Sequence, residues 1–183
     1  MTSRVSLLPL EEHDREQFIL DNQEAFLYGA TREFGLRDDH LEEDGQIISR
    51  GTIEESIDAE GAAAYRIMLE KEVVGGVVLR LDPAAQQGDL ELLFVSPEKH
   101  SAGIGFQAWC AVEKMYPEIR IWETVTPYFE KRNIHFYVNR CGFHIVEFYN
   151  CHHPDPCKRE SSCAEWDAEE RNDEMFRFEK RMW

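Results

Sequence analysis

The sequence predicts an α/β fold formed by a single domain over residues 1–183, with a mixed, mostly antiparallel central sheet of about six to seven strands and about four flanking helices. Three observations lead to this prediction. The 183 residues, of which 43% are hydrophobic, suffice for one core but are few for two. Strand-like and helix-like segments alternate along the chain. The links between some neighbouring strands are too short for anything but hairpins.

The N-terminal third is expected to form one strand and two helices. Residues 4–8 are typical of a short strand. After Pro9, apolar side chains follow at helical spacing, namely Phe18, Ile19 and Phe26. Thr52-Ile53-Glu54-Glu55 matches a capping box, which would start a second, short helix.

A hairpin is predicted in the middle of the chain. Only Glu70-Lys71-Glu72 separates the β-rich runs 64–69 and 73–81, so these runs must pair antiparallel. A second turn at residues 82–88 leads into another strand at residues 89–95.

Two helices and three strands complete the prediction. The helix over residues 103–116 has an apolar stripe and stops before Pro117. The helix over residues 130–141 ends at Gly142 as a left-handed cap. Strands are expected at residues 119–125, 143–149 and 175–182, with the last two paired. The predicted order is β-α-α-β-β-β-α-β-α-β-β, with a crossover around the helix at residues 103–116.

Charge and composition narrow the function. Lysine and arginine number 20 against 36 aspartate and glutamate residues, for a formal net charge of -16. This charge argues against nucleic acid as a partner, and it serves solubility or favours cationic substrates. Five cysteines fit reduced thiols. The sequence shows neither a signal peptide nor the roughly 20 apolar residues that span a bilayer, so we expect a cytoplasmic protein with no membrane partner.

Residues 95–109, VSPEKHSAGIGFQAW, run from a strand into a helix through a loop that contains Gly103 and Gly105. The loop matches neither the GxxxxGK[ST] phosphate loop nor the GxGxxG dinucleotide fingerprint. A helix N-terminus nevertheless favours anions, and glycines let a ligand approach the backbone closely. The alternative is that the glycines only close a tight turn.

Two segments resemble the GNAT superfamily, the acyl-CoA-dependent N-acyltransferases. His100-Ser101-Ala102-Gly103-Ile104-Gly105 stands where that superfamily carries (Gln/Arg)-x-x-Gly-x-(Gly/Ala) after its fourth strand. Residues 133–143, NIHFYVNRCGF, are similar to its second conserved segment. The resemblance covers most of the chain and implies a GNAT fold, N-acetyltransferase activity and acetyl-CoA as co-substrate, without a metal.

The resemblance also implies which residues bind the coenzyme. The pyrophosphate would lie on the glycine loop and the pantetheine arm beside the second segment. The residues so implied are Phe94, Val95, His100, Ser101, Ala102, Gly103, Ile104, Gly105, Phe106, Asn133 and Phe136. His100 departs from the superfamily pattern, because a mostly neutral histidine gives the phosphates a weaker charge than an arginine would.

Acetyl transfer to an amine needs a base, donors for the oxyanion and an acid for the thiolate. The resemblance makes Glu91 the candidate base and the backbone N–H groups near Phe94 and Val95 the oxyanion donors. It also makes Tyr137, one turn after Asn133 on the same helix face, the candidate acid. The alternatives are an outward-facing strand charge for Glu91, a polar contact or helix cap for Asn133, and a core aromatic for Tyr137.

Trp122 and Glu123 are expected to face the acceptor, because in this superfamily their strand diverges from the strand before it. Glu91 and Glu123 would then form an acidic pair suited to a cationic small-molecule or peptide amine, and either of them could be the base. A solvated strand end is the alternative for Glu123.

A catalytically silent GNAT-fold module that binds acyl-CoA or a protein partner is the main alternative to an enzyme working by direct attack of the amine. A zinc-stabilised interaction protein is a third hypothesis. Five side chains could ligate zinc: Cys151, His152, His153, Cys157 and Cys163. Their spacing is not CxxC, so we predict no metal site. The acceptor, the acyl-chain preference and a homodimer stay open.

Overall fold

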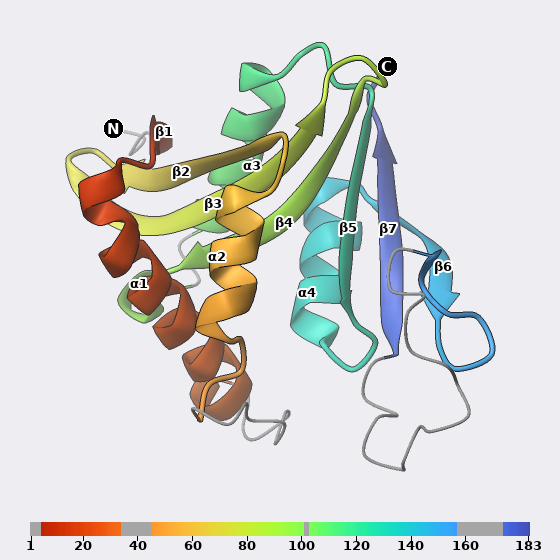
Figure 1. Ribbon diagram of the computed structural model, residues 1–183, viewed down its shortest axis with the longest axis horizontal. Coiled ribbons are helices and arrows are strands. Elements are labelled where there is room, and N and C mark those ends of the chain that lie inside the picture. Colours follow the sequence, from red (N-terminus) through yellow and green to blue (C-terminus); the bar gives the residue numbers. More distant parts are fainter. Residues whose placement is uncertain (1–4, 34–44, 101–102, 157–173) are drawn as a thin grey trace. The chain divides into compact units, whose positions relative to one another are not determined.

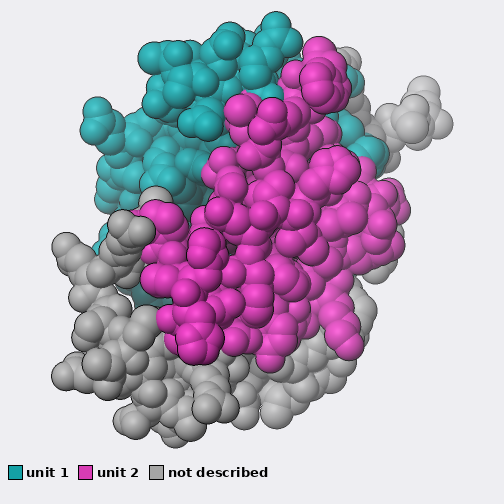
Figure 2. Space-filling model, turned by 90° about the vertical axis from the view of Figure 1, so that its right-hand side faces the viewer, with its two compact units in different colours: residues 1–120 teal, residues 121–183 magenta. Residues whose placement is uncertain are grey.

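The computed structural model describes residues 5–33, 45–100, 103–156 and 174–183. The chain divides into two compact units, residues 1–120 and residues 121–183 (Figure 2). The described residues form seven strands and four α-helices in the predicted order, and every strand pairing within either unit is antiparallel. The predicted fold class is therefore confirmed. No helix in the described ranges is long and apolar enough to cross a membrane.

The first unit contains a four-stranded sheet. Its strands pair in chain order: β1 (Val5–Pro9), β2 (Ala62–Leu69), β3 (Glu72–Asp82) and β4 (Gln87–Val95). The predicted hairpin is that of β2 and β3, in which Leu69 pairs with Glu72 across a tight turn.

Helices cover both faces of this sheet (Figure 1). They are α1 (Arg15–Tyr28), α2 (Arg50–Asp58) and α3 (Ile104–Met115). On the face of α1 and α2, the fully buried Phe18 meets Phe94 of β4 edge to face, with 5.1 Å between ring centroids. Burying a side chain of this size contributes about 1.5–3 kcal/mol. On the face of α3, the hydroxyls of Tyr65 and Tyr116 are hydrogen-bonded and tie β2 to the end of the helix.

A buried arginine also holds α1 to the sheet. Arg66 of β2 donates to the carboxylates of Asp14 and Asp21, which lie before and within α1. Its guanidinium lies 5.1 Å from the centroid of the Phe18 ring. Because an unpaired buried charge would be costly, the two carboxylates specify where α1 sits on the sheet.

The second unit is a three-stranded sheet covered by a helix. Its strands lie in the order β5 (Ile121–Pro127), β7 (Met175–Arg181) and β6 (His144–Tyr149). The covering helix begins as α4 (Lys131–His135) and continues as a π-helical segment (Phe136–Cys141). Phe143 and Phe178 are fully buried in the core of this unit.

Three local predictions differ from the structure. α2 starts before the predicted capping box, because Ser49 is the N-cap and its Oγ accepts from the N–H of Thr52 at 3.1 Å. Ile119 lies outside β5, although it is buried. The helix expected at residues 130–141 changes to π geometry at Phe136, and the left-handed cap at Gly142 is present as predicted.

Candidate active site

The loop after β4 leads to a helix start that can receive an anion. Gly103, the N-cap of α3, has a left-handed backbone with φ 72°, and no side chain caps the helix there. The backbone N–H of Gln107 donates to the carbonyl of Gly103 at 3.1 Å, a hydrogen bond of the first turn of α3. A Cβ on Gly103 would meet nothing within 4 Å, so the space beside it is open. Open space at the positive end of a twelve-residue helix suits a phosphate.

The other residues of the loop differ in exposure. Ile104 is buried, whereas Gly105 and Phe106 are partly exposed. Ser101 and Ala102 lie outside the described residues.

His100 is bound to the end of β4. Its Nε2 lies 2.7 Å from the carbonyl oxygen of Val95, and since a carbonyl only accepts, Nε2 carries the hydrogen. The ring also packs edge to face on Tyr28 of α1, with 5.4 Å between centroids. The Nε2 side of the imidazole therefore holds the loop to the end of β4. The side chain of Phe94 is in the core, so only its backbone could serve a ligand.

Glu91 is the extra residue of a β-bulge. In the pairing of β3 with β4, Leu79 is opposite Leu90 and Val78 is opposite Leu92, so Glu91 has no partner on β3. A bulge of this kind interrupts the ladder and re-aims the side chain of the extra residue. Burial still alternates along β4, but Leu90 and Leu92 face opposite sides of the sheet, because their partners Leu79 and Val78 are adjacent on β3.

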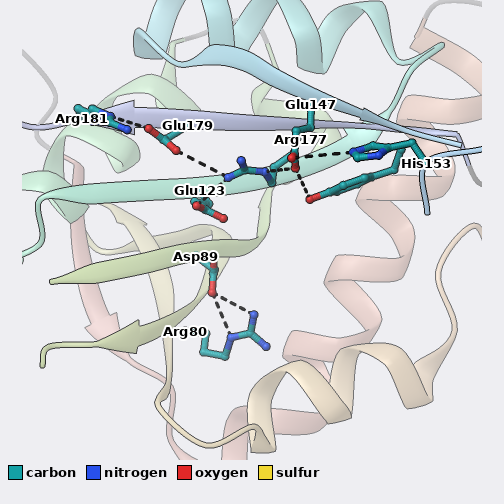
Figure 3. Close-up of polar contacts among 9 residues, drawn as sticks. Arg80, Asp89, Glu123, Glu147, His153, Arg177, Glu179 and Arg181 are labelled. Carbon is teal, nitrogen blue, oxygen red and sulfur yellow. Dashed lines mark hydrogen bonds and ion pairs between the residues drawn. The ribbon is translucent and has the colours of Figure 1, made fainter. Parts of the chain in front are cut away.

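The carboxylate of Glu91 is partly withdrawn from water, with its side chain 28% exposed. Burial raises the pKa of Glu91 above its ordinary value, the positive charge of Arg80 opposes the shift and the negative charge of Asp89 adds to it. Arg80 Nη2 lies 3.3 Å from Glu91 Oε1. It also lies 3.0 Å from Asp89 Oδ2 (Figure 3). A carboxylate with a raised pKa next to a fixed cation is the kind of group that accepts protons in catalysis.

The second unit brings Asn133 and Tyr137 to the buried face of β5. Nδ2 of Asn133 donates to Oγ1 of Thr126 at 3.2 Å, and the hydroxyl of Tyr137 is hydrogen-bonded to the side chain of Thr124. Because Asn133 and Tyr137 share a helix face and the two threonines alternate on a strand, both pairs form side by side.

The ring of Tyr137 is enclosed by aromatic side chains. Its centroid lies 5.4 Å from that of Phe136, 5.8 Å from that of Phe143 and 5.4 Å from that of Phe178. Burial raises the pKa of Tyr137 to about 12, against the lowering effect of the hydrogen bond with Thr124. The phenol therefore stays protonated at neutral pH. It packs as a core aromatic and at the same time holds a proton that it could donate.

Glu123 has a cationic partner that the sequence did not indicate. Nη1 of Arg177 on β7 lies 2.8 Å from Oε1 of Glu123, and its Nε lies 2.9 Å from Oε2 of Glu147 on β6. Figure 3 shows Arg177 in a row of polar side chains that also contains Glu179, Arg181 and His153. Glu123 is thus not an isolated negative charge.

Within the described part of the chain, no group of three or more potential ligands could hold a metal ion, and Cys157 and Cys163 lie outside that part.

Trp122 lies on the face of β5 opposite to that of Glu123, the face it shares with Thr124 and Thr126. It is completely buried, so it offers no exposed surface to an acceptor in this structure.

Sequence reasoning missed Arg80, Arg177 and the two threonines of β5. Arg80 could have been found by aligning β3 with β4 as a hairpin, which places it opposite Asp89. Arg177 could not, because it is 54 residues from Glu123 along the chain.

The chain matches the family model described as "Acetyltransferase (GNAT) family" over residues 30–143. That range contains Glu91, the glycine loop and the helix with Asn133 and Tyr137. The chain belongs to the GNAT acetyltransferase family. It is also 45% identical over 179 residues to the uncharacterized protein YrkN of Bacillus subtilis (strain 168), which covers 98% of this chain and 94% of YrkN.

Solved N-acetyltransferase structures share the fold of this GNAT chain. A chimera of the spermidine N-acetyltransferase SpeG from Vibrio cholerae and hSSAT has a TM-score of 0.64 at 15% identity, covering 98% of this chain and 96% of that chain. The ribosomal-protein-S18-alanine N-acetyltransferase of Escherichia coli has a TM-score of 0.65 at 11% identity, covering 97% and 93%. The PaiA N-acetyltransferase of Thermoplasma acidophilum, in complex with coenzyme A, has a TM-score of 0.62 at 15% identity, covering 97% and 99%. At these identities the likeness concerns the fold.

Proposed function

We propose that this GNAT protein transfers an acetyl group from acetyl-CoA to a primary amine of a small molecule or peptide, by direct attack of the amine. The observation that carries the proposal is the bulge at Glu91. It sets a partly buried carboxylate with a raised pKa on the strand that leads into the start of α3. A bulge re-aims the side chain of its extra residue, which suits a carboxylate that must reach a substrate.

The residues of the first unit fit a coenzyme. The open space beside Gly103 and the uncapped start of α3 suit its pyrophosphate, and the order that His100 imposes on the end of β4 keeps this loop in place. In the second unit, we assign Asn133 and Phe136 to the pantetheine arm. The coenzyme supplies the acetyl thioester.

The proposed proton transfers balance. Glu91 accepts a proton from the attacking amine, directly or through a water molecule, while the new C–N bond forms. Backbone N–H groups near Phe94 and Val95 stabilise the oxyanion of the tetrahedral intermediate. Tyr137 gives its proton to the thiolate as the C–S bond breaks; Glu91 then releases its proton to solvent, and solvent reprotonates Tyr137. The products are an N-acetylated amine and free coenzyme A.

Glu123 is our candidate contact for a cationic acceptor. Its ion pair with Arg177 weakens the electrostatic attraction between Glu123 and such an acceptor. Glu123, Glu147 and Glu179 outnumber Arg177 and Arg181, so this face of the sheet retains a negative charge. Structures with the same fold include acetyltransferases named for spermidine and for the alanine of a ribosomal protein. Both names describe amine acceptors, one a small molecule and one a protein, and this range supports the proposed class.

A coenzyme-binding module without catalysis is the second candidate, and the enclosure of Tyr137 by three rings favours it. Release of free thiol from acetyl-CoA in the presence of polyamines, aminoglycosides, amino acids and lysine peptides separates the two. We expect amine-dependent thiol release that Glu91→Gln reduces by at least 100-fold, within the usual range of general base catalysis of about 100- to 10,000-fold. Tight binding of acetyl-CoA by calorimetry without thiol release from any amine would instead establish the module.

A further inference from the structure

Two threonines of β5 make matching contacts with the helix that covers them. Thr124 and Thr126 are 5% and 3% exposed, and both point toward that helix. Thr124 reaches Tyr137, and Thr126 reaches Asn133 four residues earlier in the helix.

We propose that Thr124 and Thr126 are positioning residues with separate tasks: Thr124 orients the phenol of Tyr137 for proton transfer, and Thr126 orients the amide of Asn133 for the coenzyme. This inference rests on the proposed function, because it assigns the tasks by the roles of Tyr137 and Asn133. It goes further by naming two residues that act only through those neighbours.

The phenol needs such a partner because packing alone does not fix its proton. The three aromatic rings hold the plane of Tyr137, but its O–H bond can still rotate. When the hydroxyl of Thr124 donates to the phenol oxygen, the phenol proton must point elsewhere, which leaves it available to a leaving group. Valine has nearly the shape of threonine but no hydroxyl, so Thr124→Val removes this restraint without opening a cavity.

For Asn133 the restraint concerns the amide plane. Nδ2 donates to Oγ1 of Thr126, and this bond decides which end of the amide faces away from β5. With Thr126→Val the amide can turn over, so its remaining donor and acceptor are no longer fixed. The expected effect is on coenzyme affinity rather than on proton transfer.

The kinetic test compares Thr124→Val and Thr126→Val, which are matched controls because they make the same chemical change at equally buried sites. We expect Thr124→Val to lower kcat about tenfold with the KM for acetyl-CoA within about twofold, and Thr126→Val to do the reverse. Thr124→Ser should restore kcat. In the Tyr137→Phe background, Thr124→Val should lower kcat no further. Equal effects of both variants on kcat and KM, or a full effect of Thr124→Val without the phenol, would overturn the inference.

Unfolding by urea gives a test that does not depend on activity. Double-mutant cycles should show coupling between Thr124→Val and Tyr137→Phe and between Thr126→Val and Asn133→Leu, whereas Thr124→Val and Asn133→Leu should be additive. Additivity in the first two cycles would overturn the inference alone. Failure of the wild-type protein to transfer acetyl groups to any amine of the panel would overturn the proposed function, and with it the assigned tasks, even if the coupling is found.

Discussion

Arg177 on β7 places its Nη1 2.8 Å from Oε1 of Glu123 on β5, and both side chains are mostly withdrawn from solvent. Glu123 and Glu179 are direct cross-strand partners, a pairing of like charges that is unfavourable without a cation between them. Arg177 therefore stabilises this sheet and reduces the pull of Glu123 on a cationic acceptor.

Replacing Arg177 tests both effects. Arg177→Met should lower the free energy of unfolding by about 1–2 kcal/mol at pH 7, because Glu123 loses its partner, and should lower the KM for a polyamine acceptor. Arg177→Lys keeps the charge and is the control. A raised polyamine KM with unchanged stability would contradict the expectation.

The stability effect of Arg177 should depend on pH. Hydrogen bonds from Tyr149 and Arg177 lower the pKa of Glu147. A carboxyl with a lowered pKa contributes stability above its unfolded pKa of about 4.3 and loses it as the pH falls through the folded value. The difference between wild type and Arg177→Met, measured by urea unfolding, should therefore shrink from pH 7 toward pH 3. A difference that stays constant with pH would assign the effect to packing by the arginine stem.

Glu91→Gln should lose turnover and gain stability. The loss should be about 100- to 10,000-fold, or about 3–5 kcal/mol of barrier. Because burial raises the pKa of Glu91, its ionised form is disfavoured in the fold, so the charge costs stability once the pH exceeds the unfolded pKa. The variant should accordingly have a higher Tm than wild type at pH 7 but not at pH 4. Equal Tm values at both pH values would show that Glu91 is as well solvated as an ordinary surface carboxylate.

Arg80 should set the acid limb of the pH profile. Its charge lowers the pKa of Glu91, so Arg80→Gln should move the fall of kcat/KM on the acid side to higher pH, while Arg80→Lys should leave it nearly in place. Profiles measured between about pH 5 and 8 would detect the shift. A shift to lower pH would mean that Glu91 is not the group that titrates.

The glycine loop can be tested with a matched pair of variants. Gly103 and Gly45 have φ values of 72° and 77°, and a Cβ on either would meet nothing within 4 Å. Gly103→Ala and Gly45→Ala should therefore cost similar stability, about 1–2 kcal/mol each. Only Gly103→Ala should weaken binding of acetyl-CoA in calorimetry, by about tenfold, because its methyl group enters the space proposed for the pyrophosphate. Gly105→Val should abolish binding. Equal affinity of all three variants would remove the loop from the coenzyme site.

Tyr137→Phe removes only the hydroxyl. If the phenol protonates the thiolate, turnover should fall at least about tenfold while acetyl-CoA affinity is kept. With a pKa of about 12, the phenol should also cause no loss of activity in the mildly alkaline range. A less stable protein with full turnover would leave Tyr137 only its role in the core.

Much of the fold could be predicted from the sequence because its signals are local. The hairpin of β2 and β3 follows from a short link, and the stop of the helix at Gly142 from the need for a left-handed cap. The bulge at Glu91 could not be predicted, since alternating burial continues through it along β4 and only the pairing with β3 reveals the extra residue. The pairing of Glu123 with Arg177 depends on β7 lying beside β5, a long-range contact without a local signal.

The same bulge makes Glu91 dispensable to the architecture. If Glu91 were deleted, Leu90 and Leu92 would become neighbours along β4, and their partners Leu79 and Val78 are already neighbours along β3. The ladder would close without a gap, and every apolar side chain of β4 would keep the face it has now. A chain shorter by this one residue would thus have a regular pairing of β3 with β4. Its removal would take away the bulge, the carboxylate and the ion pair of that carboxylate with Arg80.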